Sequence, residues 1–283
     1  MKKILILIIA VFSLTGCLKN DSMEDISITT SVYPIQYIVD YLYGDYSEIS
    51  SIYPNDSNIN EFKITNVLLK DYSKNDLFIF NGLSEENKYV KTMKKNNNEL
   101  KIIDSTANMT FEYSLEELWL DPNNLLTIAN NIKNGFNEYI KANYLINKID
   151  ENYTNLKFEL TSLDGKFYST VKNSEYDYII VDDDAFKFLE KYGLTVISLD
   201  KDTVKEKDIY TAKELLNDGD CSYIFTVYGN EKSDTVDEIL TSTGKTNLEL
   251  YTMTDLSELN IEKNNYITLM NDNLNQLKQE LYK

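Results

Sequence analysis

Short apolar runs alternate with helical stretches in the first part of this chain, and that alternation constrains the fold more than any other feature. The runs 26–30, 49–53, 77–80 and 100–103 have the length and composition of buried strands. Between them, 33–42 carries apolar residues at helical spacing and 64–72 favours a second helix. Strands that alternate with helices predict a parallel sheet with helices on its faces.

The alternation stops at Pro122, where Asp121-Pro122 predicts a capped helix start. Two helical stretches follow, 122–139 and 141–172, although Gly165 is a candidate break in the second. Strand and helix patterns then alternate again, with strands at 178–181, 195–199, 223–226 and 248–251 and helices near 184–192, 209–217, 233–243 and 261–281.

This order predicts an α/β protein of two lobes, each with a parallel sheet flanked by helices, joined by a long helix. The expected N-terminal lobe is 26–140, the connecting helix is 141–172, and the C-terminal lobe is 173–283. Loops at the carboxyl ends of parallel strands usually hold ligands, so 56–61, 104–121 and 182–184 are the candidate site loops.

The N-terminus has the pattern of an export signal. Lys2 and Lys3 precede an apolar run at 4–12 that is too short to cross a bilayer as a helix, so 1–16 is expected to be a signal peptide. The ending Leu-Thr-Gly-Cys resembles the lipobox of bacterial lipoproteins, which implies a lipid on Cys17, a tether at 17–25 and a place on the extracytoplasmic face of the cell membrane. An ordinary signal peptide with a cysteine nearby is the alternative.

Composition excludes most enzyme classes. The chain has no histidine, no Cys-x-x-Cys pair and no glycine-rich phosphate loop, so we expect no enzymatic activity. A metal hydrolase built on the carboxylates of 182–184 is the remaining enzymatic alternative. The formal charge of −18 disfavours nucleic acid and favours cations. With Cys17 lipidated, Cys221 has no disulfide partner and is expected to be a small buried side chain.

Five segments carry a family resemblance: Thr29–Ile35, Asp76–Gly82, Leu118–Pro122, Asp184–Phe186 with the following 191–194, and 265–277. They are similar, in this order, to segments of the extracytoplasmic solute-binding lipoproteins of zinc and manganese ABC importers. The resemblance covers nearly all of the mature chain. It implies two α/β lobes joined by a helix, one divalent metal ion as the transported ligand, and the permease and ATPase subunits of an importer as partners. We expect the protein to be a monomer.

The resemblance also implies where a metal would bind. That family usually uses three histidines and one carboxylate, and these positions fall on Asn60, Glu117 and Asp183, with the carboxylate near Asp255. Trp119, beside the second position, is interpreted as a core aromatic residue. The histidine-rich loop of many zinc-specific members is absent.

Such an oxygen-donor set suits manganese, magnesium or calcium better than zinc, which prefers imidazole and thiolate. Three adjacent aspartates at 182–184 repel one another, and a cation touching Asp183 would relieve that repulsion. The alternatives are a solvated Glu117 at a helix start and a solvated loop in which Asp184 caps the next helix. Two functions stay open: a receptor for an oxygen-preferring ion, or a degenerate member that binds no metal and acts as a surface interaction or adhesion lipoprotein.

Overall fold

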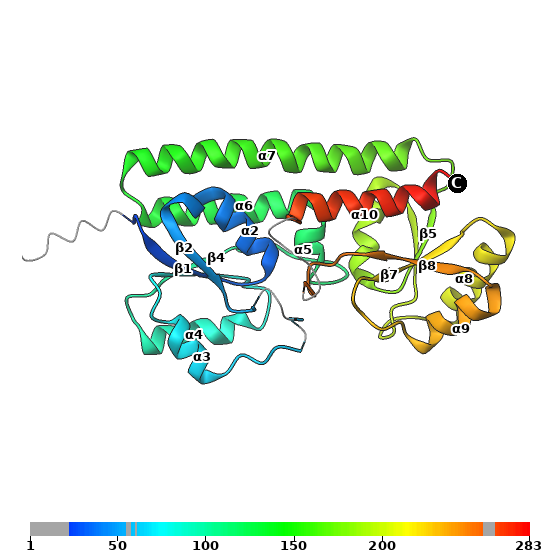
Figure 1. The fold of residues 1–283 in the computed structure, drawn as a ribbon, viewed down its shortest axis with the longest axis horizontal. Coiled ribbons are helices and arrows are strands. Elements are labelled where there is room, and N and C mark those ends of the chain that lie inside the picture. Colours follow the sequence, from blue (N-terminus) through cyan, green and yellow to red (C-terminus); the bar gives the residue numbers. More distant parts are fainter. Residues whose placement is uncertain (1–22, 55–57, 60, 257–263) are drawn as a thin grey trace, which may run out of the picture.

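The computed structural model describes residues 23–54, 58–59, 61–256 and 264–283, so the expectations for the signal peptide 1–16, Cys17 and Asn60 lie outside the described residues. Two lobes lie side by side along the long axis of the molecule (Figure 1). The helix α7 (Asn143–Lys172) runs along the N-terminal lobe and extends over part of the C-terminal lobe, and α6 (Pro122–Tyr139) packs against it. The predicted architecture of two parallel α/β lobes joined by a long helix is confirmed.

The N-terminal lobe contains a four-stranded parallel sheet in the order β2-β1-β3-β4. Its strands are β1 (Ile26–Thr30), β2 (Ser47–Ser51), β3 (Leu77–Phe80) and β4 (Lys101–Asp104). In the register, Ile28 of β1 is paired with Ile49 on one side and with Leu77 on the other. The inner face packs on α2 (Tyr33–Tyr43) and α6, and the outer face on α3 (Asn66–Tyr72) and α4 (Glu86–Asn96), while η1 (Gly44–Tyr46) leads into β2.

The C-terminal lobe repeats this plan with the order β6-β5-β7-β8, again fully parallel. Its strands are β5 (Tyr178–Val181), β6 (Thr195–Ser198), β7 (Tyr223–Val227) and β8 (Thr246–Leu250). The helices α8 (Glu206–Asp218) and α9 (Asp234–Thr243) cover the outer face. The inner face packs on η2 (Asp184–Tyr192), α7 and α10 (Tyr266–Leu281).

One apolar core continues from the first lobe into the second. It contains Ile28 of β1, Trp119 of the short helix α5 (Glu117–Leu120), Leu160 of α7, Phe186 of η2 and Tyr266 of α10. Each lobe also has one smaller core, which lies under its outer helices. The two lobes therefore share the largest of the three hydrophobic cores that the described residues form. The expectations that Trp119 and Cys221 are buried are both confirmed.

Several expected boundaries are wrong by two or three residues: the second strand is Ser47–Ser51 rather than 49–53, and α8 begins at Glu206 rather than at 209. The helix expected at 184–192 is present as the 3-10 helix η2, and the residue after it, Gly193, has a φ of 109° in the left-handed region. Gly165 does not break α7, because buried neighbours such as Leu163 and Phe167 stabilise the helix more than one glycine weakens it. The helix α4 has few apolar residues, so its pattern is weak in the sequence and it was not expected. Within the described residues, no helix is both long and apolar enough to cross a membrane.

Candidate metal centre at the lobe junction

The helix α5 lies where the two lobes meet, and its tryptophan connects them. The Nε1–H of Trp119 donates a hydrogen bond of 2.8 Å to the carbonyl oxygen of Thr252, which follows β8 in the second lobe. The hydroxyl of Tyr266 donates to the carbonyl oxygen of Trp119 at 2.6 Å. Asp121 caps α6 as predicted, accepting from the backbone N–H of Asn123 at 2.8 Å, and forms an ion pair with Lys191 of η2. The candidate ligand Glu117 therefore lies on a helix that is packed between the two lobes.

Glu117, the first residue of α5, points toward the backbone of its own loop. Its Oε2 accepts hydrogen bonds from the backbone N–H groups of Glu112 and Tyr113, at 3.1 and 3.2 Å. This carboxylate closes the loop that precedes α5. Its neighbour Glu116 is the residue whose charge acts on Asp183 of the second lobe.

Asp255 lies against the loop that contains the first candidate position. The side chain of Asn58 donates to Oδ2 of Asp255 at 3.3 Å, and the backbone N–H of Ile59 donates to the carbonyl oxygen of Thr254 at 3.1 Å. Asn58 and Asp255 also form an antiparallel bridge. The structure therefore brings the segment after β8 directly beside the residues on one side of position 60.

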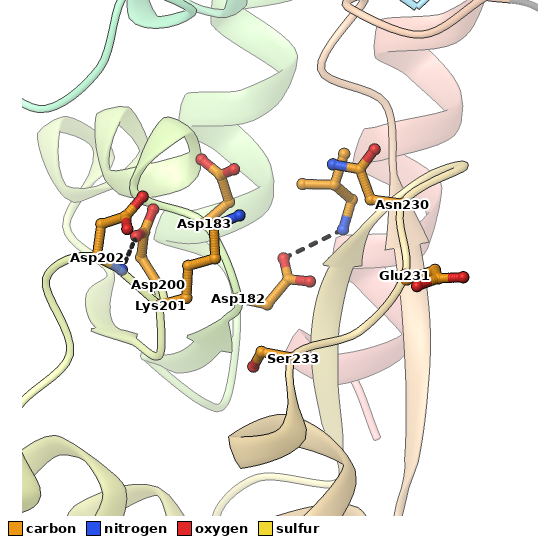
Figure 2. A pocket seen from close by; sticks show the side chains of 9 residues that line it. Asp182, Asp183, Asp200, Lys201, Asp202, Asn230, Glu231 and Ser233 are labelled. Atoms are coloured by element: carbon orange, nitrogen blue, oxygen red, sulfur yellow. Dashed lines mark hydrogen bonds between the residues drawn. The ribbon is translucent and has the colours of Figure 1, made fainter. Parts of the chain in front are cut away.

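Asp183 contributes to an acidic cavity at the carboxyl ends of β5, β6 and β7 (Figure 2). The cavity measures about 140 Å³, and most of its lining is polar: Asp182, Asp183, Asp200, Lys201, Asp202, Val227, Asn230, Glu231 and Ser233. Figure 2 shows the carboxylates of Asp182 and Asp183 pointing in different directions, as expected for adjacent residues at a strand end.

Each of these two aspartates accepts a backbone hydrogen bond, from Val227 to Asp182 at 3.1 Å and from Ala185 to Asp183 at 2.8 Å. Burial and the charge of Asp183 raise the pKa of Asp182 to about 7. Burial raises the pKa of Asp183 to about 6, with further contributions from nearby carboxylates that include Glu116 and Asp200. Burial is the main cause of both raised pKa values, and the neighbouring carboxylates add to it.

The residue that caps η2 is not the one expected in the alternative of a solvated loop. Asp183, and not Asp184, caps it. Asp184 is buried, accepts from the hydroxyl of Thr203 at 3.0 Å and lies 3.5 Å from the ammonium of Lys187. Asp184 is therefore a structural residue of the second lobe.

The three candidate ligands in the described part of the chain, Glu117, Asp183 and Asp255, are not gathered into one preformed cluster. Among the residues that the structure describes, no group of three or more Asp, Glu, Cys or His side chains is arranged to hold a metal ion. Asp255 lies beside Asn58, Asp183 lines the acidic cavity, and Glu117 faces its own loop.

Comparison with known protein families shows which family the chain belongs to. The family model of ZnuA, zinc-uptake complex component A periplasmic, matches residues 28–280. This chain belongs to the ZnuA family. The family resemblance of the sequence motifs is thereby confirmed, and the chain is a member of a family of extracytoplasmic solute-binding proteins of metal-uptake ABC systems rather than of an enzyme family.

Solved structures of ZnuA-like proteins share the fold. The Zn(II)-bound ZnuA-like domain of AdcA from Streptococcus pneumoniae has a TM-score of 0.74 at 19% identity, covering 92% of this chain and 100% of that one. The metal-dependent lipoprotein YcdH from Bacillus subtilis gives the same four values. The laminin-binding protein Lbp of Streptococcus pyogenes has a TM-score of 0.72 at 18% identity, covering 91% of this chain and 99% of that one. None of the curated proteins compared with the chain matches it.

Two acidic residues of this ZnuA-family member escaped the sequence analysis although a signal existed for them. Asp200 and Asp202 follow β6 just as 182–184 follow β5, so the rule for the carboxyl ends of parallel strands could have selected them too. Glu116 could not be distinguished from Glu117 in the sequence, because only the loop conformation decides which of two adjacent carboxylates faces the second lobe.

Proposed function

We propose that this protein binds one divalent cation through oxygen ligands at the lobe junction and delivers it to the permease and ATPase subunits of an ABC importer. A lipid on Cys17 would hold it at the extracytoplasmic face of the membrane. Family membership supports the transport role. The observation that supports the altered site is the acidic cavity, in which the half-buried carboxylates of Asp182 and Asp183 lie close to Asp200 and Asp202.

The proposed ligands are Asn60, Glu117, Asp183 and Asp255. For Asp183, a bound cation would offset the effects of burial and of the neighbouring carboxylates that raise its pKa. For Asp255, one partner is the neutral amide of Asn58, which an ion of higher charge can replace. Glu117 would have to exchange its two backbone donors for the metal, a cost that lowers affinity. The chain has no imidazole. Compared with a site built from histidines, this site should therefore favour manganese, magnesium or calcium more and zinc less.

Thermal unfolding of the chelator-treated protein with each ion tests this function. We expect manganese or calcium to raise the melting temperature, because an ion at a hundredfold excess over its Kd stabilises the folded state by about 2.7 kcal/mol. Asp183→Asn and Asp255→Asn should each abolish most of that rise. Asp218→Asn, at the exposed end of α8, is the matched control and should keep it.

A tight one-to-one zinc site in titration calorimetry would contradict the oxygen-donor assignment. A response that survives both substitutions would place the ion elsewhere. If no ion changes the melting temperature, the second function holds: a family member that kept the fold, lost the metal and acts as a surface interaction lipoprotein. The backbone hydrogen bonds that already occupy Glu117 are the observation that favours this second function.

A further inference from the structure

The N-terminal lobe has a larger cavity whose chemistry differs from that of the acidic one. It measures about 470 Å³, within the range of about 300–1,000 Å³ that is usual for small-molecule sites. Its walls are largely aromatic and aliphatic, with a few polar groups: Val32, Tyr53, Ile59, Phe62, Asn81, Leu83, Ser84, Glu85, Glu86, Tyr89, Phe111, Leu115, Glu116 and Trp119.

A buried carboxylate, Glu86 of α4, lies in this cavity wall. It is 2% exposed, and its two oxygens accept hydrogen bonds from the hydroxyl of Ser31 at 2.6 Å and the backbone N–H of Asn81 at 2.8 Å. Both donors are neutral, and the ion pairs found among the described residues do not include Glu86. Burial raises the pKa of Glu86 to about 7, as expected for a carboxylate that lacks a cationic partner.

Aromatic side chains surround the same space. Tyr53 and Phe62 meet edge to face, with ring centroids 6.3 Å apart, and the negative charge of Glu86 is among the causes that raise the pKa of Tyr53. Phe111 is 42% exposed and Leu83 is 37% exposed, so two large apolar side chains of the lining remain open to solvent. Aromatic faces attract cations, and aromatic cages with a nearby carboxylate hold ammonium groups.

We propose that this cavity binds an organic ammonium ion with an apolar or aromatic body, its cationic head directed toward Glu86. A neutral ligand would leave the buried charge of Glu86 uncompensated, and an anion would add to the repulsion from Glu86 and Glu116. A metal ion fits poorly, because the three glutamates of the lining, Glu85, Glu86 and Glu116, are not among any described group of acidic side chains that could hold one. Among the residues that the structure describes, the lining includes none of the proposed metal ligands, although Glu116 adjoins Glu117.

The test compares three probes of one shape, 2-phenylethylammonium, 2-phenylethanol and phenylacetate, on the chelator-treated protein by titration calorimetry. We expect one-to-one binding of the ammonium, binding of the alcohol that is weaker by about tenfold or more, and no binding of the anion. Equal affinity for ammonium and alcohol, or no binding of the ammonium, would overturn the proposal.

Two variants locate the site. Glu86→Gln should weaken 2-phenylethylammonium by about tenfold while leaving 2-phenylethanol nearly unchanged, a difference that a folding defect would not produce. Phe111→Ala should weaken the ammonium by about threefold. Phe158→Ala, on a phenylalanine of α7 that is 75% exposed and lies outside the cavity lining, is the matched control and should have no effect. If the Phe158 variant lost affinity as the Phe111 variant does, the cavity would not be the site.

Discussion

At the scale of single residues, the buried Glu86 makes stability depend on pH. Its folded-state pKa is about 7, above the ordinary value of 4.5, so its contribution is fully present below about pH 4.5 and is lost as the pH rises through 7. A difference of this size corresponds to a loss on the order of 3 kcal/mol in the free energy of unfolding. The Glu86→Gln variant should therefore lack the part of the decline in unfolding free energy between pH 4.5 and 7 that comes from Glu86.

Urea unfolding at a series of pH values, on the parent and the variant, measures this difference. Glu85→Gln is the control, because Glu85 is exposed and pairs with Lys88 at 2.7 Å. The Glu85 variant should follow the parent at every pH. Parallel curves for the parent and Glu86→Gln would show that the buried carboxylate does not titrate in this range.

At the scale of elements, the contact between α5 and α10 stabilises the junction. The hydroxyl of Tyr266 is fully buried and donates to the carbonyl oxygen of Trp119. Tyr266→Phe keeps the ring but leaves that buried carbonyl without this donor, which should lower the free energy of unfolding by about 1–3 kcal/mol. Chemical denaturation measures it. Tyr210→Phe, on an exposed tyrosine of α8 bonded to Glu214, should change stability by less than about 0.5 kcal/mol; a similar loss in both variants would refute the assignment.

The sequence predicts the elements well, but it does not predict how the candidate site residues are oriented. The positions of the strands and of most helices can be predicted from apolar periodicity, because that pattern depends on residues close together in the sequence. The orientation of Glu117 depends on two backbone N–H groups in an irregular loop, and no periodic pattern encodes it. Glu86 looks like an ordinary helix-start glutamate, because one of its two donors, Ser31, follows β1 and lies 55 residues away in the sequence. Periodicity thus predicts layers, whereas tertiary packing determines which carboxylates are desolvated.

At the scale of the whole molecule, the shared core should make the two lobes unfold together. The core extends from Ile28 in the first sheet through Leu160 of α7 to Phe225 in the second sheet, so neither lobe can open without exposing apolar surface of the other. We expect a single calorimetric transition whose calorimetric and van't Hoff enthalpies agree. Two separate transitions, or far-UV circular dichroism that precedes the heat absorption, would show independent lobes.

The position of Trp119 also gives the protein an optical reporter of its own. The chain has 22 tyrosines but a single tryptophan, so excitation at the red edge of the aromatic absorption selects one indole ring. That ring is 1% exposed and its N–H bonds to Thr252 across the junction. Any movement that separates α5 from the segment after β8 would hydrate the indole and shift its emission to longer wavelength. Separation of the two lobes at the junction can therefore be followed in the unlabelled protein in real time.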